Sequence, residues 1–134
     1  MRKTRVAFEV VSPLGYTEAV VRARAALAAE GFGVQSEIDV QATLRAKLGV
    51  EREPYLILGA CHAPSADQAL QAAPDIGVLL PCNVTVSREG GRTVVRALDP
   101  DAVMGVLGKP ELASVGAHVS AALQRVLAAC ERES

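Results

Sequence analysis

Two dipeptides, each placed after an apolar run, carry the side chains best suited to chemistry in this chain. They are Cys61-His62 and Cys82-Asn83. Polar side chains at the end of a strand are well placed for a binding site, because the strand is rigid and the loop that follows it is exposed. These four residues are therefore the first candidates for contact with a small ligand.

Thiolates and an imidazole together suit Zn²⁺ or Cu⁺, so convergence of Cys61, His62 and Cys82 would create a metal site. The chain has no Cys-x-x-Cys pair and no evident fourth ligand, so the spacing does not specify a zinc motif. One alternative is that the cysteines are buried and pack as small hydrophobic residues. Another is a reactive thiol at Cys61 or Cys82, with His62 as its base. We place a non-enzymatic module that binds a small ligand or a metal ion first, and a thiol-dependent redox protein or enzyme second.

Charged candidates form a second group, at Glu37, Asp39 and Lys47. The two carboxylates are two residues apart on a segment with strand-like alternation, which directs them to the same side as a pair suited to acid–base chemistry. Asp39 also directly precedes an amphipathic segment, so helix N-capping is its structural alternative. Lys47 lies on that next helix, where it either binds an anion or is simply solvated. His118 is expected at the boundary of the last helix.

Composition limits the class of protein. The chain has 134 residues, 50% of them hydrophobic, with a formal net charge of −1, which suits one globular domain. Two Phe, two Tyr and no Trp do not favour a stacking surface for single-stranded nucleic acid, and no basic run indicates duplex binding. We expect no signal peptide and no segment that approaches a membrane span. An odd cysteine count, three, favours a reducing compartment, so we expect a cytoplasmic protein.

Hydrophobic periodicity predicts an α+β domain with a mixed sheet, in the order βαβαβαββαα. The strand over residues 54–60 is apolar nearly throughout, which predicts a central strand covered on both faces. Residues 74–88 are expected to be extended, with an edge position or a bulge at Pro81. The last helix, from about residue 110, has an apolar stripe that must pack on the sheet or on a second subunit. The stripe consists of Leu112, Val115, Val119, Leu123, Val126, Leu127 and Cys130.

Several blocks in matching order resemble family 302 of the domains of unknown function, over about residues 6–126. They are EGFGVQSEIDVQATLRAKLGV, PYLILGAC, APDIGVLLPCNVTV and ALDPDAVM. The resemblance implies a compact α+β domain, a homodimer and no established activity, so a purely structural interaction dimer is our third hypothesis. Where the family typically reads GACNPP, this chain reads GACHAP, with His62 in place of Asn and Ala63 in place of Pro. The substitution puts any role of the Asn amide in doubt and adds an imidazole.

Overall fold

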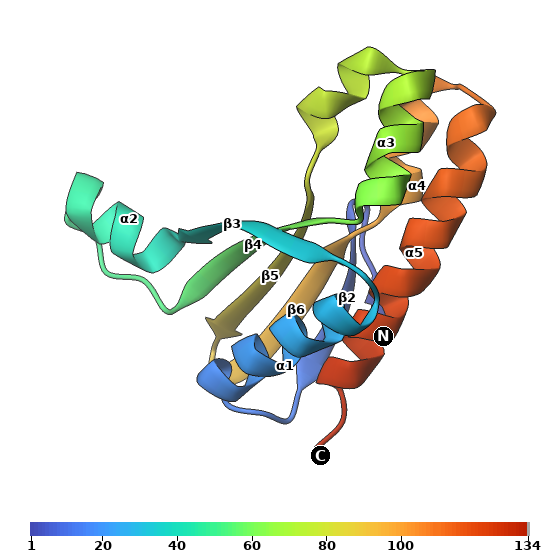
Figure 1. Ribbon diagram of the computed structural model, residues 1–134. Helices are drawn as coiled ribbons and strands as arrows, with labels where there is room; N and C mark the ends of the chain where they lie inside the picture. The colour runs from blue at the N-terminus through green and yellow to red at the C-terminus, as the bar shows by residue number, and fades with distance from the viewer. Residues whose placement is uncertain (134) are drawn as a thin grey trace.

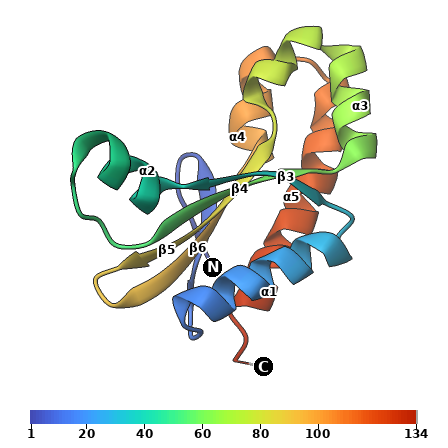
Figure 2. The ribbon, with the colours of Figure 1, turned by 60° about the vertical axis from the view of Figure 1, so that its left-hand side comes forward.

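The structure is a computed structural model that describes residues 1–133. In it the chain forms a six-stranded antiparallel sheet with helices packed on one face (Figures 1 and 2). The order of the strands is β1-β2-β6-β5-β4-β3. Their bounds are β1 Arg2–Lys3, β2 Ala7–Ser12, β3 Gly33–Asp39, β4 Tyr55–Cys61, β5 Cys82–Glu89 and β6 Arg92–Leu98. The predicted α+β class is confirmed, although all the pairings among these strands are antiparallel, whereas we expected a mixed sheet.

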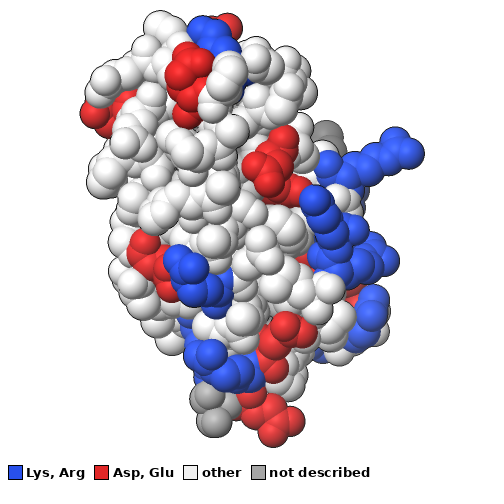
Figure 3. Space-filling model, turned by 90° about the vertical axis from the view of Figure 1, so that its right-hand side faces the viewer, with Lys and Arg blue, Asp and Glu red and all other residues white. Residues whose placement is uncertain are grey.

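Within residues 1–133 the chain forms five α-helices and two short 3₁₀ helices, of which α4, η2 and α5 follow the last strand. They are α1 Tyr16–Ala29, α2 Val40–Leu48, α3 Ala63–Ala72, η1 Pro74–Leu79, α4 Pro100–Met104, η2 Gly105–Leu107 and α5 Glu111–Cys130. Helices α1 and α5 pack against each other and against the sheet, while α3 and α4 pack against α5. On the side of the molecule where α5 lies, Figure 3 shows a broad uncharged area below a few charged side chains at the top, with Lys and Arg gathered along one edge and toward the lower end.

The core lies between α1, α5 and one face of the sheet. Alternate residues of the inner strands, such as Leu58 of β4 and Val84 of β5, point into it and are fully buried. Every residue of the predicted apolar stripe on α5 is buried, so this stripe packs on the sheet and not on a second subunit. By length and composition alone α5 would pass as a membrane span, contrary to our expectation for this sequence, but 56% of its most apolar window is buried inside the domain.

Strand β4 corrects one prediction, because it lies next to the edge strand β3 and helices cover only one of its faces. Leu58 points to the helices with no exposed surface, whereas Ile57 points to the open face and is half-buried. The β4 sequence is therefore apolar on both faces of the strand, although only one face packs on the core. Sequence periodicity cannot distinguish a strand covered on both faces from one whose open face is partly apolar.

The segment after α3 corrects a second prediction. Residues Pro74–Leu79 form the 3₁₀ helix η1, and only from Cys82 onward is the chain a strand. Pro74 stands at the first position of η1, where its fixed φ and missing N–H suit a helical turn. Pro81 lies just before β5, and β5 is an inner strand between β4 and β6, so the proline marks neither an edge strand nor a bulge.

Candidate functional site

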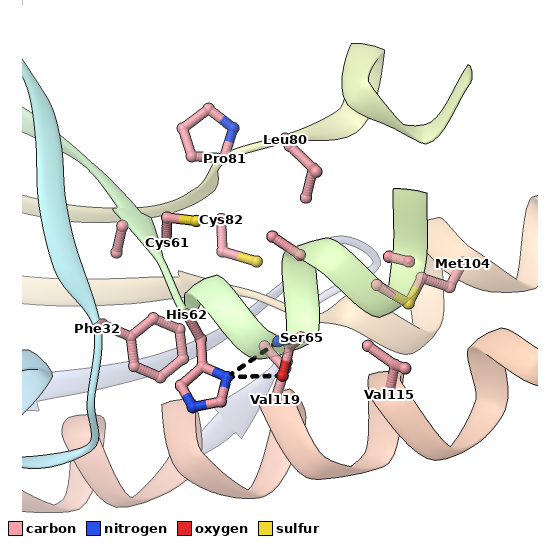
Figure 4. Close-up of a pocket in the computed structure, with 13 residues that line it drawn as sticks. Phe32, Cys61, His62, Ser65, Leu80, Pro81, Cys82, Met104, Val115 and Val119 are labelled. Atoms are coloured by element: carbon pink, nitrogen blue, oxygen red, sulfur yellow. Dashed lines mark hydrogen bonds between the residues drawn. The ribbon is translucent and has the colours of Figure 1, made fainter. Parts of the chain in front are cut away.

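The ends of β4 and β5 meet helices α3 and α5 around a narrow apolar pocket (Figure 4). The space open to the centre of a water-sized molecule is about 20 Å³. That is room for roughly one water molecule or one ion. The pocket is lined by Phe32, Ala60, Cys61, His62, Ser65, Ala66, Ala69, Leu80, Pro81, Cys82, Met104, Val115 and Val119.

Cys61 and Cys82 both line this pocket, as free thiols from neighbouring strands. Cys82 pairs with Ala60 across β4 and β5, and Cys61 is the next residue of β4, at the end of that strand. Burial, together with the nearby Cys61, raises the pKa of the Cys82 thiol to about 11. Cys82 therefore keeps its proton near neutral pH, which makes it a weak nucleophile.

His62 lies on the same pocket wall but is engaged with helix α3. It is the N-cap of α3, and its Nδ1 lies 2.7 Å from Ser65 Oγ and accepts from the Ser65 backbone N–H at 3.4 Å. Its ring packs between Phe32, at 5.6 Å between ring centroids, and His118, at 5.3 Å. Among residues 1–133, no three His, Cys, Asp or Glu side chains are arranged to hold one metal ion. The structure thus brings together the two thiols, but not the predicted Cys61–His62–Cys82 ligand set.

The N-cap role of His62 predicts how its substitution affects stability. Asn is among the best N-cap residues, and it is the residue that the family resemblance leads us to expect at this position. We expect His62→Ala to lower the free energy of unfolding by about 1 kcal/mol, the usual loss when a cap is removed. His62→Asn, which retains an acceptor for the Ser65 N–H, should stay within about 0.5 kcal/mol of the wild type. Urea denaturation of both variants tests this, and equal stabilities of the two would contradict it.

The charged candidates lie away from the pocket. Asp39 is the N-cap of α2, where it accepts from the Ala42 N–H at 2.9 Å, so its structural interpretation is confirmed. It pairs with Leu56, toward the end of β4 opposite to Cys61. Glu37 forms an ion pair with Arg24. Burial raises the pKa of the Tyr16 hydroxyl, and the charges of Asp39 and Glu37 add to the shift.

Lys47 and Asn83 also lie outside the pocket. Lys47 is exposed on α2, whose nine residues are all at least partly exposed and which stands away from the body of the domain (Figure 1). Asn83 is exposed and pairs with Gly59, and strand alternation directs it to the face opposite to that of Cys82. Neither residue lines the pocket.

Gly59 is a positioning residue that sequence analysis missed. A Cβ added to it would lie 2.1 Å from Ser36 Oγ and 2.9 Å from Pro81 Cγ, so only glycine lets β3 and the chain before Cys82 approach β4 this closely. The signal in the sequence is a glycine inside an otherwise apolar strand, which marks a close approach of neighbouring chain. Ser65 and Met104 were missed as pocket residues, because nothing local indicates that α3 and α4 face the strand ends.

Comparisons with known proteins agree with this architecture. A family model described as "Domain of unknown function DUF302" matches residues 8–130. Among solved structures, the crystal structure of an uncharacterised conserved DUF302 protein from Bacillus stearothermophilus is 29% identical in sequence. It covers 92% of this chain and 97% of its own, with a TM-score of 0.87. No curated protein matches the chain.

Proposed function

Because this chain belongs to the DUF302 family, which is defined without an activity, we propose a function from the pocket itself: the protein is a binding module that holds one Cu⁺ ion between Cys61 and Cys82. The observation that carries the proposal is that two thiols from neighbouring strands share an apolar pocket of about 20 Å³. Of the residues predicted to bind a ligand or a metal ion, the proposal keeps the two cysteines that line this pocket.

The chemistry of the pocket favours a soft, small cation. Thiolate sulfurs select Cu⁺ over harder ions such as Mg²⁺ or Ca²⁺, and a coordinating thiol loses its proton to the metal. A complex of Cu⁺ with two thiolates carries one net negative charge. Side chains of low polarity, such as Ala69 and Val119, surround the site and limit the access of water to the ion.

A thiol-dependent enzyme is less well supported by the same geometry. A nucleophilic cysteine needs a lowered pKa so that it is present as a thiolate. Burial instead raises the pKa of Cys82 to about 11. The pocket has room for roughly one water molecule, far less than the 300 Å³ or more that is typical of substrate pockets. His62 does not supply a free base to either thiol through Nδ1, since this atom is hydrogen-bonded to Ser65.

The homodimer remains a proposal, and edge strand β3 is the surface that best supports it. In the sheet, β3 pairs with β4 on one side only. Ile38 on this strand and Leu48 on the adjoining α2 are 48% and 69% exposed. A second chain that paired with β3 would cover an open strand edge and extend the sheet. A cytoplasmic location also stays a prediction.

The proposed function is tested by titration of the reduced, tag-free protein with Cu⁺ in competition with a chromogenic Cu⁺ chelator. We expect one ion per chain and an apparent affinity that rises at least about tenfold per pH unit between pH 6 and 8. The sign follows from the Cys82 pKa of about 11: the free protein holds the thiol proton throughout this range, and the complex has released it. No binding, or binding that does not change with pH, would contradict the proposal.

A further inference from the structure

We propose that His62 and His118 form a second metal site, for a divalent ion such as Ni²⁺ or Zn²⁺, in which two imidazoles bind the ion and water completes its coordination. The chain has only two histidines, and the fold places their ring centroids 5.3 Å apart, with the ring planes tilted by 49°. One comes from the loop before α3 and the other from α5. Imidazole nitrogens are good ligands for these ions.

The separation of the rings fits a shared ion. A metal–nitrogen bond of about 2.0–2.1 Å places the ion roughly 3.2 Å from the centroid of an imidazole ring. Two rings that bind one ion at a tetrahedral angle then have their centroids about 5.2 Å apart. The observed 5.3 Å is close to this value, so the ion requires little movement of the ring centres.

The free nitrogen of His62 points in the direction that the site requires. Nδ1 is 2.7 Å from Ser65 Oγ, so Ser65 occupies that side of the ring, and Figure 4 shows Nε2 directed toward α5, the helix that carries His118. A hydrogen bond from one ring nitrogen to a fixed partner is the usual way in which a metal-binding histidine is oriented. Metal binding through Nε2 requires the tautomer in which Nδ1–H donates to the Ser65 hydroxyl, so the ion exchanges the weak 3.4 Å contact of the Ser65 backbone N–H with Nδ1 for a bond to Nε2. Phe32 packs against His62 and further limits the rotation of its ring.

The surroundings of His118 suit a hydrated cation. The side chain is exposed, so water reaches the remaining coordination positions. The Glu30 carboxylate is near enough for its charge to interact with His118, and it is held in place by Arg125 at 2.8 Å. These contacts leave Glu30 as a nearby charge and not as a third ligand, in agreement with the absence of a three-residue cluster of ligands within residues 1–133.

This site uses different donor atoms from the thiol pocket, so the two proposals can fail separately. The test is calorimetric titration of tag-free protein with Ni²⁺, in a chain that carries Cys61→Ala and Cys82→Ala to remove thiol binding. We expect one Ni²⁺ per chain, and an affinity at least about tenfold weaker when either His62→Asn or His118→Gln is added. His62→Asn is suited to this purpose because Asn retains the N-cap of α3. Absence of Ni²⁺ binding, or binding that neither substitution weakens, would overturn the inference.

A second measurement reads the two rings directly. In proton NMR of the same double-cysteine variant, addition of diamagnetic Zn²⁺ should shift the ring protons of both histidines together and to the same end point. A shift of only one ring, or of neither ring, would contradict a shared ion. Since the chain has no other histidine, the assignment needs only one of the two histidine variants.

Discussion

Replacement of Cys61 and Cys82 together by alanine is expected to weaken Cu⁺ binding at least a hundredfold. Even changes in the outer shell of a metal site cost about 10–100-fold in affinity, and this variant removes both proposed ligands. Each single replacement leaves one sulfur in the pocket and should give an intermediate loss. Competition titration with the chelator measures all three variants against the wild type.

Cys130 supplies a matched control for this prediction. Its thiol is fully buried, and burial raises its pKa to about 11, as it does for Cys82. It faces the core from the end of α5 and does not line the pocket. Cys130→Ala should therefore leave the affinity for Cu⁺ unchanged, although it costs some stability. An equal loss of affinity in Cys130→Ala would show that the effect follows from core damage and not from lost ligands.

Replacement of Gly59 by alanine is expected to have the second large effect, on both stability and Cu⁺ affinity. The new Cβ would meet Ser36 Oγ at 2.1 Å and the Pro81 ring at 2.9 Å. The Ser36 side chain can rotate away, but the proline ring cannot, so the chain that leads into Cys82 must move. We expect the free energy of unfolding to fall by about 1–3 kcal/mol, as in other overpacked sites.

Gly33 is the control for this substitution, because it lies in the neighbouring strand β3 with no atom within 4 Å of an added Cβ. Gly33→Ala should change the free energy of unfolding by less than about 0.5 kcal/mol. Addition of Ser36→Ala to Gly59→Ala should recover part of the lost stability, since it removes the shorter of the two contacts. If urea denaturation shows that Gly59→Ala is as stable as the wild type, the close contact of Gly59 with Ser36 and Pro81 does not constrain the pocket.

Local patterns in the sequence account for much of the fold. Asp39 precedes an amphipathic segment, and its side chain caps the predicted helix. The apolar stripe of α5 has helical spacing, and all of it is buried. Prediction was wrong for residues 74–79, which we expected to be extended and which form a 3₁₀ helix. The turn of helix there depends on how α3 and β5 must be joined, which is a tertiary constraint that the residues themselves do not express.

The candidate site was predicted only in part. Cys61 and Cys82 were both candidates because each follows an apolar run, but that they line one pocket follows from the antiparallel pairing of β4 and β5 in the structure. The direction of the His62 ring could not be predicted, since it depends on the hydrogen bond with Ser65 at the start of α3. The approach of His118 depends on how α5 crosses the sheet, over a long separation in sequence. The direction of the His62 ring and the packing of α5 therefore could not be predicted from the sequence alone.

The most direct test of the central claim is copper K-edge X-ray absorption of the protein loaded with one equivalent of Cu⁺. The proposed function predicts a first shell of two sulfur atoms, unchanged in Cys130→Ala and lost when both Cys61 and Cys82 are alanine. A first shell of nitrogen or oxygen atoms, or a two-sulfur shell that persists without these two cysteines, would contradict it.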